Sequence, residues 1–131
     1  MKRVVVTGAG GLMGWHAQVQ LYAANCAARF RRDPLPYDII ALDHAKFDEE
    51  SALKSAVKGA DAILHFAGVN RGSEKDLELA NSAIACRLVG ACKAVGVNPH
   101  IVYANSIHSS TDTAYGRSKR RAAEVLGGFA S

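Results

Sequence analysis

A tyrosine and a lysine stand four positions apart near the end of the chain, in Tyr115-Gly116-Arg117-Ser118-Lys119. On a helix this spacing places both side chains on one face. An isolated phenol ionises at about pH 10, and a nearby ammonium group stabilises the phenolate, so the pair can exchange a proton at lower pH. Ser106 precedes the pair and can hydrogen-bond a substrate carbonyl or hydroxyl. The three side chains predict acid/base chemistry, with a turn or capping role as the alternative for Ser106.

Three glycines follow a β-branched apolar run at the N-terminus. In a phosphate-binding loop Gly8 permits the tight turn, Gly11 lets the backbone approach a pyrophosphate, and Gly14 allows close packing of helix and strand. The amides of Leu12 and Met13 would then donate to phosphate oxygens at the positive end of a helix. The position of the glycines between a strand and a helix favours a dinucleotide site over a merely flexible turn.

An acidic residue, Asp43, follows the second apolar run, Ile39 to Leu42. In dinucleotide sites an acid at this place accepts hydrogen bonds from the ribose 2′-hydroxyl, which favours NAD. His44 and Lys46 come next, where they can meet the 2′-phosphate of NADP. The sequence therefore predicts NAD or NADP, with NAD favoured. The alternative for Asp43 is a turn residue at the end of a strand.

Short apolar runs alternate with longer segments of helical period, which predicts an α/β fold with a parallel sheet. Strands are expected over Val4 to Val6, Tyr37 to Asp43, Ala62 to Phe66 and Ile101 to Ala104. Helices are expected from Leu12 to Phe30, from Asp48 or Ser51 to Lys58, from Ser73 to Gly96, and from Tyr115 to a fraying end at Gly127-Gly128. Ser106 and Tyr115 would thus follow the last strand, at the carboxyl end of the sheet, where ligands bind.

The composition fits one globular domain: 131 residues, 49% hydrophobic and 21% charged, with a net charge of +4. The basic excess lies mainly in Arg117, Lys119, Arg120 and Arg121. Such a patch attracts a phosphate-bearing small molecule or solvates a helix, and we favour these readings over RNA or DNA binding. The first apolar run breaks at Thr7, too soon for a signal peptide or a membrane span, so no membrane partner is expected.

Three cysteines, Cys26, Cys86 and Cys92, form no C-x-x-C pair, which indicates a reduced cytoplasmic location. The last two are expected to pack as small core residues of a helix. The histidines show no metal-ligand spacing, so no metal is predicted. His65 is expected to pack in the third strand, and His108 to serve a loop.

The order of these motifs resembles that of the short-chain dehydrogenase/reductase superfamily, in its extended branch, the NAD-dependent epimerase/dehydratase family. The resemblance is carried by Thr7-Gly8-x-x-Gly11-x-x-Gly14, Asp61-Ala62-x-x-x-His65-Phe66-Ala67-Gly68, Ser106 and Tyr115-x-x-x-Lys119. It implies a Rossmann-type doubly wound parallel sheet, with Ala67, Gly68 and Val69 close to the cofactor and Asn81 matching an asparagine of the following helix. The segment Ala67 to Gly72 is also similar to capsule-sugar reductases, which reduce the 4-keto group of a UDP-linked deoxysugar.

The resemblance implies an NAD(P)-dependent oxidoreductase or epimerase acting on a nucleotide-linked sugar. Ser106 would orient the substrate, Tyr115 would be the acid/base, and Lys119 would support both the phenolate and the nicotinamide ribose during hydride transfer to or from nicotinamide. Tyr115 and Lys119 would therefore also contact the cofactor. Family members dimerise through the helices after the third and fourth strands, which implies a homodimer.

Family members continue beyond the Y-x-x-x-K helix, whereas this sequence ends at Ser131. We therefore expect residues 1–131 to form the N-terminal portion of an NAD(P)-binding Rossmann domain, truncated before the C-terminal strands and the substrate-binding lobe. The alternative function is a truncated dinucleotide-binding module without catalytic turnover.

Overall fold

The computed structural model describes residues 1–130, so Ser131, the last residue of the predicted domain, lies outside the described residues. The element order is β1 (Lys2–Thr7), α1 (Leu12–Arg31), β2 (Tyr37–Leu42), α2 (His44–Asp48), α3 (Glu50–Val57), β3 (Ala62–His65), α4 (Glu74–Val95), β4 (His100–Tyr103), the 3-10 helix η1 (Ile107–Ser110) and α5 (Ala114–Ala130). Strands alternate with helices along the chain, and the predicted α/β class is confirmed.

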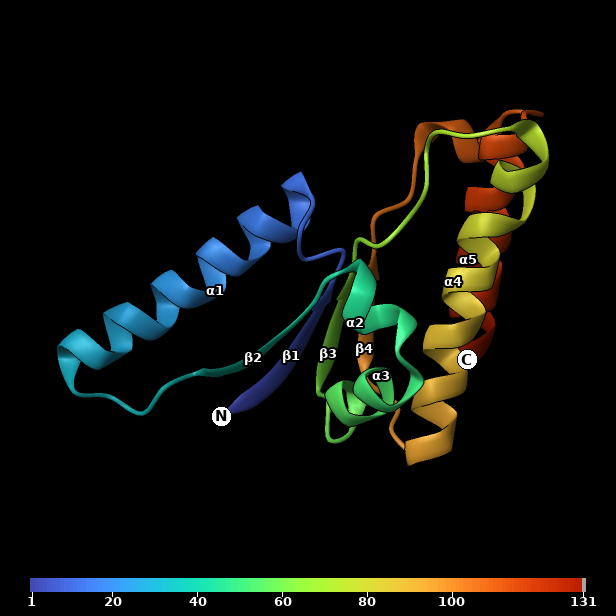
Figure 1. Cartoon of the computed structure of the whole chain (residues 1–131). Helices are drawn as coiled ribbons and strands as arrows, with labels where there is room; N and C mark the ends of the chain where they lie inside the picture. Colours follow the sequence, from blue (N-terminus) through green and yellow to red (C-terminus); the bar gives the residue numbers. More distant parts are fainter. Residues whose placement is uncertain (131) are drawn as a thin grey trace.

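The four strands form one parallel sheet in the order β2-β1-β3-β4. Val5 in the middle of β1 pairs with Ile40 on one side and Ile63 on the other, and Ile63 pairs with Ile101 of β4. Because all strands run the same way, their carboxyl ends meet at one edge of the sheet. The segments that hold the predicted site residues all leave the sheet at this edge (Figure 1).

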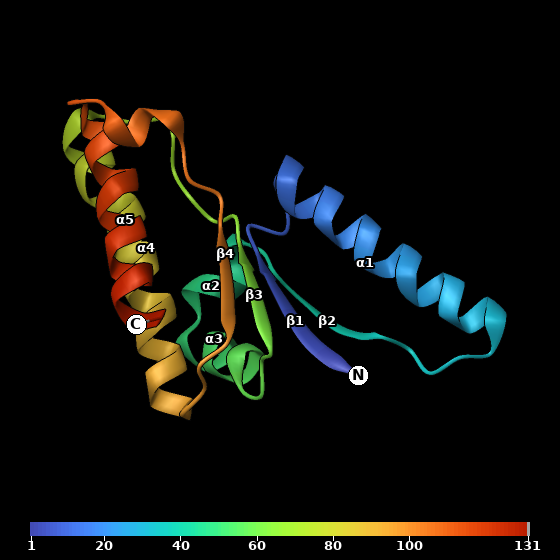
Figure 2. The same cartoon turned by 180° about the vertical axis from the view of Figure 1, so that it is seen from behind.

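The two faces of the sheet are covered unequally (Figures 1 and 2). Helices α2 to α5 pack on one face, where the buried core includes Val5, Ile63, Leu88, Ala122 and Leu126. Helix α1 lies on the other face and contacts β1 and β2. No helix among residues 1–130 has both the length and the apolar character needed to cross a membrane.

Helix α1 is fixed to the sheet by one buried side chain. The Nδ2 of Asn25 donates to the carbonyl of Tyr37 at 2.9 Å, and Tyr37 N donates to its Oδ1 at 3.1 Å. Several large apolar side chains of the helix are exposed, among them Trp15, Tyr22 and Phe30. The described residues therefore cover the sheet face on the side of α1 only in part.

Several expected element ends differ in the structure. Neither Asp48 nor Ser51 begins the helix after β2; Asp43 caps α2 instead, because its Oδ1 accepts from Lys46 N at 2.9 Å, and α3 follows as a separate helix. The expected fraying at Gly127-Gly128 is wrong, since α5 continues to Ala130.

Packing explains why α5 does not fray, because Leu126 is buried in the core and holds the last turns of α5 in place despite the two glycines.

The two cysteines of α4 differ in burial. Cys92 is buried as expected, but Cys86 lies exposed on the outer side of the helix.

Candidate functional site

The loop between β1 and α1 has the geometry predicted from its glycines. Gly8 has a φ of +64°, and a Cβ there would lie 2.7 Å from backbone atoms of Phe66 and Ala67. A Cβ at Gly14 would collide with the carbonyl oxygen of Gly8. These two glycines therefore permit a turn and a close backbone approach that a larger residue would block. Gly11 is exposed and makes no comparably close contact.

The start of α1 leaves backbone donors at this loop. The first helical hydrogen bond runs from Trp15 N to the carbonyl of Gly11 at 2.9 Å, so the amides of Leu12 and Met13 precede it. Amides at a helix N-terminus, next to a backbone cradle free of side chains, suit the oxygens of a phosphate group. The residues of this loop thus fit a dinucleotide pyrophosphate.

A first hollow opens beside this loop, between the ends of β1, β2 and β3. It is lined by Gly8, Asp43, His44, Phe47, Asp48, Ala67, Gly68, Val69 and Ile84. Asp43 lies at the place predicted for ribose recognition, but its Oδ1 also caps α2 through the amide of Lys46. Asp43 therefore has a structural role at the end of β2, where a turn residue was the alternative to ribose binding.

A second hollow adjoins the first and brings the predicted acid/base residues together. Its lining comprises Met13, Phe66, Gly68, Val69, Asn70, Asn81, Ala104, Asn105, Ser106, Tyr115 and Lys119. Gly68 and Val69 belong to both hollows. A ligand that spans the two would therefore cross the loop after β3 and end beside Ser106, Tyr115 and Lys119.

The loop after β3 is held by Asn81 of α4. Val69 N donates to Asn81 Oδ1 at 2.8 Å, and Asn81 Nδ2 donates back to the carbonyl of Val69 at 2.9 Å. Asn81 is itself fixed from α5, because its backbone amide donates to Ser118 Oγ at 3.1 Å. A Cβ at Gly68 would lie 2.9 Å from Asn81 Oδ1, so this close arrangement needs the glycine.

Lys119 reaches the floor of the second hollow from α5. Its Nζ donates to the carbonyl of Ala104 at 2.6 Å and lies 4.4 Å from the ring centroid of Tyr103. The residue is only 7% exposed, and this burial lowers the pKa of its ammonium group.

Ser106 lies at the rim of the same hollow and begins η1. Its Oγ accepts from His108 N at 3.1 Å, so the capping role considered for this serine is present. The His108 ring belongs to the loop, as expected, and contacts the Tyr115 ring edge-on with 6.1 Å between centroids.

A buried histidine of β3 contacts residues of β1, α2 and β4. His65 Nδ1 lies 2.7 Å from Thr7 Oγ1, which also accepts from Ala67 N at 3.1 Å. The imidazole stacks between the rings of Phe47 and Tyr103. Burial, with a smaller effect of the Lys119 charge, lowers the pKa of His65 to about 4, so the ring is neutral at pH 7. Sequence reasoning predicted the packing of His65 but not its bond to Thr7.

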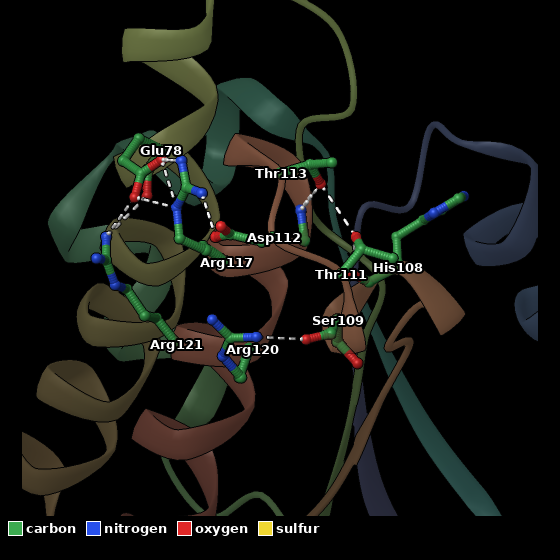
Figure 3. Close-up of polar contacts among 10 residues, drawn as sticks. Glu78, His108, Ser109, Thr111, Asp112, Thr113, Arg117, Arg120 and Arg121 are labelled. Atoms are coloured by element: carbon green, nitrogen blue, oxygen red, sulfur yellow. Dashed lines mark hydrogen bonds and ion pairs between the residues drawn. The ribbon is translucent and has the colours of Figure 1, made fainter.

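A side-chain network fixes the loop before Tyr115, and nothing in the sequence predicted it (Figure 3). Arg117 donates to both carboxylate oxygens of Glu78 and, at 2.7 Å, to Asp112 Oδ1. Thr113 Oγ1 accepts from Gly116 N at 3.0 Å. A Cβ at Gly116 would collide with the carbonyl oxygen of His108, so the loop presses directly on the first turn of α5.

The basic run of α5 is largely engaged within the chain. Arg121 pairs with Glu78 at 3.1 Å, Arg120 donates to the carbonyl of Ser109 at 3.0 Å, and Lys119 is buried. The arginines at the Glu78 carboxylate hold its pKa below the usual value. Among residues 1–130 no three His, Cys, Asp or Glu side chains are grouped to share a metal ion.

The fold and the site define a class of protein. The model of the NAD dependent epimerase/dehydratase family matches residues 4–128, and the chain belongs to this family. This match confirms the family that the motifs resemble. It also confirms, at the level of the family, the NAD-type cofactor.

Among particular proteins, the chain is similar to a UDP-2-acetamido-2,6-beta-L-arabino-hexul-4-ose reductase of Pseudomonas aeruginosa. The two are 31% identical over 128 residues, which is 95% of this chain and 30% of that reductase. It is also similar to the capsular polysaccharide assembling protein CapF of Staphylococcus aureus, with 27% identity and a TM-score of 0.66 over 97% of this chain and 31% of that one.

The fold is shared with MoeE5, solved in complex with UDP-glucuronic acid and NAD, with a TM-score of 0.70, 23% identity, and coverage of 98% of this chain and 50% of that one. The chain therefore spans about a third to a half of the length of these relatives. A four-stranded piece of a Rossmann-type fold accounts for this coverage.

Proposed function

We propose that this chain is the cofactor-binding and acid/base portion of an NAD-dependent oxidoreductase or epimerase acting on a nucleotide-linked sugar. The observation that carries the proposal is that Ser106, Tyr115 and Lys119 line one hollow, which shares Gly68 and Val69 with the hollow beside the phosphate loop. The P. aeruginosa relative is a UDP-sugar reductase, which supports a UDP-linked keto sugar as the substrate.

The glycine loop would hold the cofactor. Gly8, Gly11 and Gly14 shape the backbone, the amides of Leu12 and Met13 face the pyrophosphate, and Asp43 receives the ribose. The segment Ala67 to Val69, which lines the hollow beside the loop, would hold the middle part of the cofactor. When bound, NAD supplies a nicotinamide ring that accepts or donates a hydride. An acid at the end of β2 supports NAD over NADP, because a 2′-phosphate would meet the Asp43 carboxylate.

The acid/base residues would act on the sugar. Ser106 Oγ donates a hydrogen bond to the reacting oxygen and orients it toward the Tyr115 hydroxyl, which gives or takes the proton. Lys119 Nζ, held at the hollow floor, stabilises the phenolate and can donate to the cofactor ribose as well as to Ala104. These are the roles that the family resemblance implies for the three residues.

The test has two stages on the 131-residue chain. Isothermal titration calorimetry with NAD and NADP measures binding, and absorbance of the reduced cofactor then follows reduction of a UDP-linked 4-keto sugar. Binding with turnover is the expected result. Binding without turnover would favour the alternative, a dinucleotide-binding module. No binding of either dinucleotide would overturn both.

We also propose a cytoplasmic homodimer formed through α4 and α5, and residues 1–131 as an NAD(P)-binding portion. A hollow on the outer side of these two helices, lined in part by Gly90, Val125 and Phe129, offers a surface on which a second copy can pack. Three free cysteines suit a reducing compartment. Analytical ultracentrifugation checks the dimer, since a monomer at all concentrations would contradict it.

A further inference from the structure

Tyr103, the last residue of β4, lies directly beneath the ammonium group of Lys119. The distance from Lys119 Nζ to the ring centroid is 4.4 Å, well within the range of a cation–π contact. The same Nζ donates to the carbonyl of Ala104, the residue after Tyr103. One short segment at the end of β4 therefore supplies both a ring and a carbonyl to the ammonium group.

The ring is held in place from its other side. Tyr103 stacks on His65 with 5.6 Å between centroids and an interplanar angle of 23°, and His65 in turn stacks on Phe47. His65 is tied to β1 through Thr7. The ring under Lys119 is thus the end of a stack of three rings, and it has little freedom to turn away.

The hydroxyl of Tyr103 does not explain why a tyrosine stands at this position. It is buried and has no hydrogen-bond partner among residues 1–130, and burial, with a smaller effect of Tyr115, raises its pKa to about 12. A buried hydroxyl without a partner costs stability. What the residue contributes to its surroundings is the face of its ring.

Lys119 needs such support because its surroundings otherwise disfavour the charge. It is buried, its pKa is lowered by that burial, and Nζ lies only 3.9 Å from the Cβ position of Gly68. The titratable groups that face it are His65 on β3, Tyr103 on β4 and Tyr115 on its own helix. His65 is neutral at pH 7, and burial raises the pKa of Tyr103 to about 12, so neither supplies a negative charge that could hold the ammonium group.

We propose that Tyr103 is a positioning residue, whose ring face holds the Lys119 ammonium at the floor of the second hollow and keeps it charged there. The catalytic consequence rests on the proposed function of Lys119, whereas the contact itself can be tested without any turnover. The residue acts through Lys119 and need not touch substrate or cofactor.

The experiment is an NMR titration of the 131-residue chain with ¹³C-labelled lysine, following the Lys119 side chain, which is identified by its loss in Lys119→Arg. Tyr103→Leu removes the ring and should lower the pKa of Lys119 by about 0.5 to 1.5 units. Tyr103→Phe keeps the ring, removes only the unpartnered hydroxyl, and should restore the wild-type value.

Because Tyr103→Leu also removes packing volume, a second series keeps the volume nearly constant. Phenylalanines carrying one, two or three ring fluorines at position 103 weaken the attraction of the ring face for a cation. The Lys119 pKa should then fall stepwise with each fluorine. An unchanged or rising pKa along this series would overturn the proposal. This experiment contains no cofactor, so that outcome would not bear on NAD binding or turnover, which are tested separately.

Discussion

The two ends of the candidate site are built by different means. The phosphate-loop end is shaped by backbone, because Gly8 and Gly14 bring chain segments too close together for any side chain. The end formed by β4 and α5 is shaped by side chains: Tyr103 lies under Lys119, and Arg117 joins Glu78 to Asp112. In the function proposed above, the first end would bind a group common to many cofactors, whereas the second would position particular reacting atoms.

This difference sets the kind of change that damages each end. Adding one carbon atom should disable the backbone end, while removing a functional group should disable the side-chain end. His65 joins the two, since it bonds to Thr7 of β1 and stacks on Tyr103 of β4. Four substitutions test these expectations.

Tyr115→Phe should have the largest effect. Loss of the phenol removes the proton donor and acceptor, and general acid/base groups contribute about 10²- to 10⁴-fold to rate. Turnover of a UDP-linked keto sugar should fall by that factor, while NAD affinity changes by less than about 10-fold. The matched control is Tyr22→Phe, at an exposed position of α1. Retention of full turnover in Tyr115→Phe would show that the side-chain end does not perform the chemistry proposed here.

His65→Asn should change the pH dependence of stability. The pKa of His65 is about 4 in the folded chain against 6.5 unperturbed, so the unfolded chain binds the proton first as the pH falls. The stabilisation from neutral His65 is complete above pH 6.5 and declines between pH 6.5 and 4, by about 3 kcal/mol at pH 4.

Urea unfolding at several pH values between 7 and 4 measures this loss. Asparagine can keep an acceptor for Thr7 but does not titrate, so its stability should vary less with pH over the same range. His16→Asn, at an exposed position of α1, should retain the wild-type dependence. Equal slopes for wild type and His65→Asn would contradict a neutral, buried imidazole between the two ends.

The turn of the phosphate loop could be predicted from the sequence because its residues are consecutive, whereas the approach of Gly8 to Phe66 and Ala67 joins distant segments. The conformation of Gly8 and its close approach to Gly14 depend on a few consecutive residues, and the glycine motif contains all of these residues. The meeting of Ser106 with Tyr115 and Lys119 followed from the parallel sheet, whose strand ends share one edge.

The supporting contacts of the other end could not be predicted, because they join distant segments. Glu78 and Arg117 are one turn from the start of different helices, and no spacing rule relates them. The alternation of β4 indicates that Tyr103 faces the core but not which cation lies over it. The predicted burial of Cys86 was wrong for a similar reason. Small residues occur on both sides of α4, so the sequence does not show which side is buried.

Gly14→Ala should disable the backbone end although alanine is the better helix former. The added Cβ would collide with the Gly8 carbonyl, which must shift and take the amides of Leu12 and Met13 with it. We expect NAD affinity to fall by at least about 10-fold and stability by about 1–3 kcal/mol. Gly10→Ala is the control, because a Cβ there meets nothing within 4 Å. Calorimetry with NAD compares the two, and equal affinities would contradict a backbone-built cradle.

Arg117→Met should have the smallest effect, because it removes only exposed or half-exposed ion pairs to Glu78 and Asp112 while keeping the aliphatic stem. The loop from Ile107 to Thr113 should exchange its amide hydrogens faster. Turnover should fall by about 2- to 5-fold, with NAD affinity unchanged, because the phosphate loop lies at the other end of the site.

The control is Arg87→Met, which removes a comparable pair with Asp48 far from this loop and should leave the exchange of residues 107–113 as it was. Faster exchange in Arg117→Met alone would tie the loop to that arginine. Equal exchange in both variants would mean that the close contact of Gly116 with His108 holds the loop by itself, in which case the side-chain end also depends on backbone packing at its most crowded point.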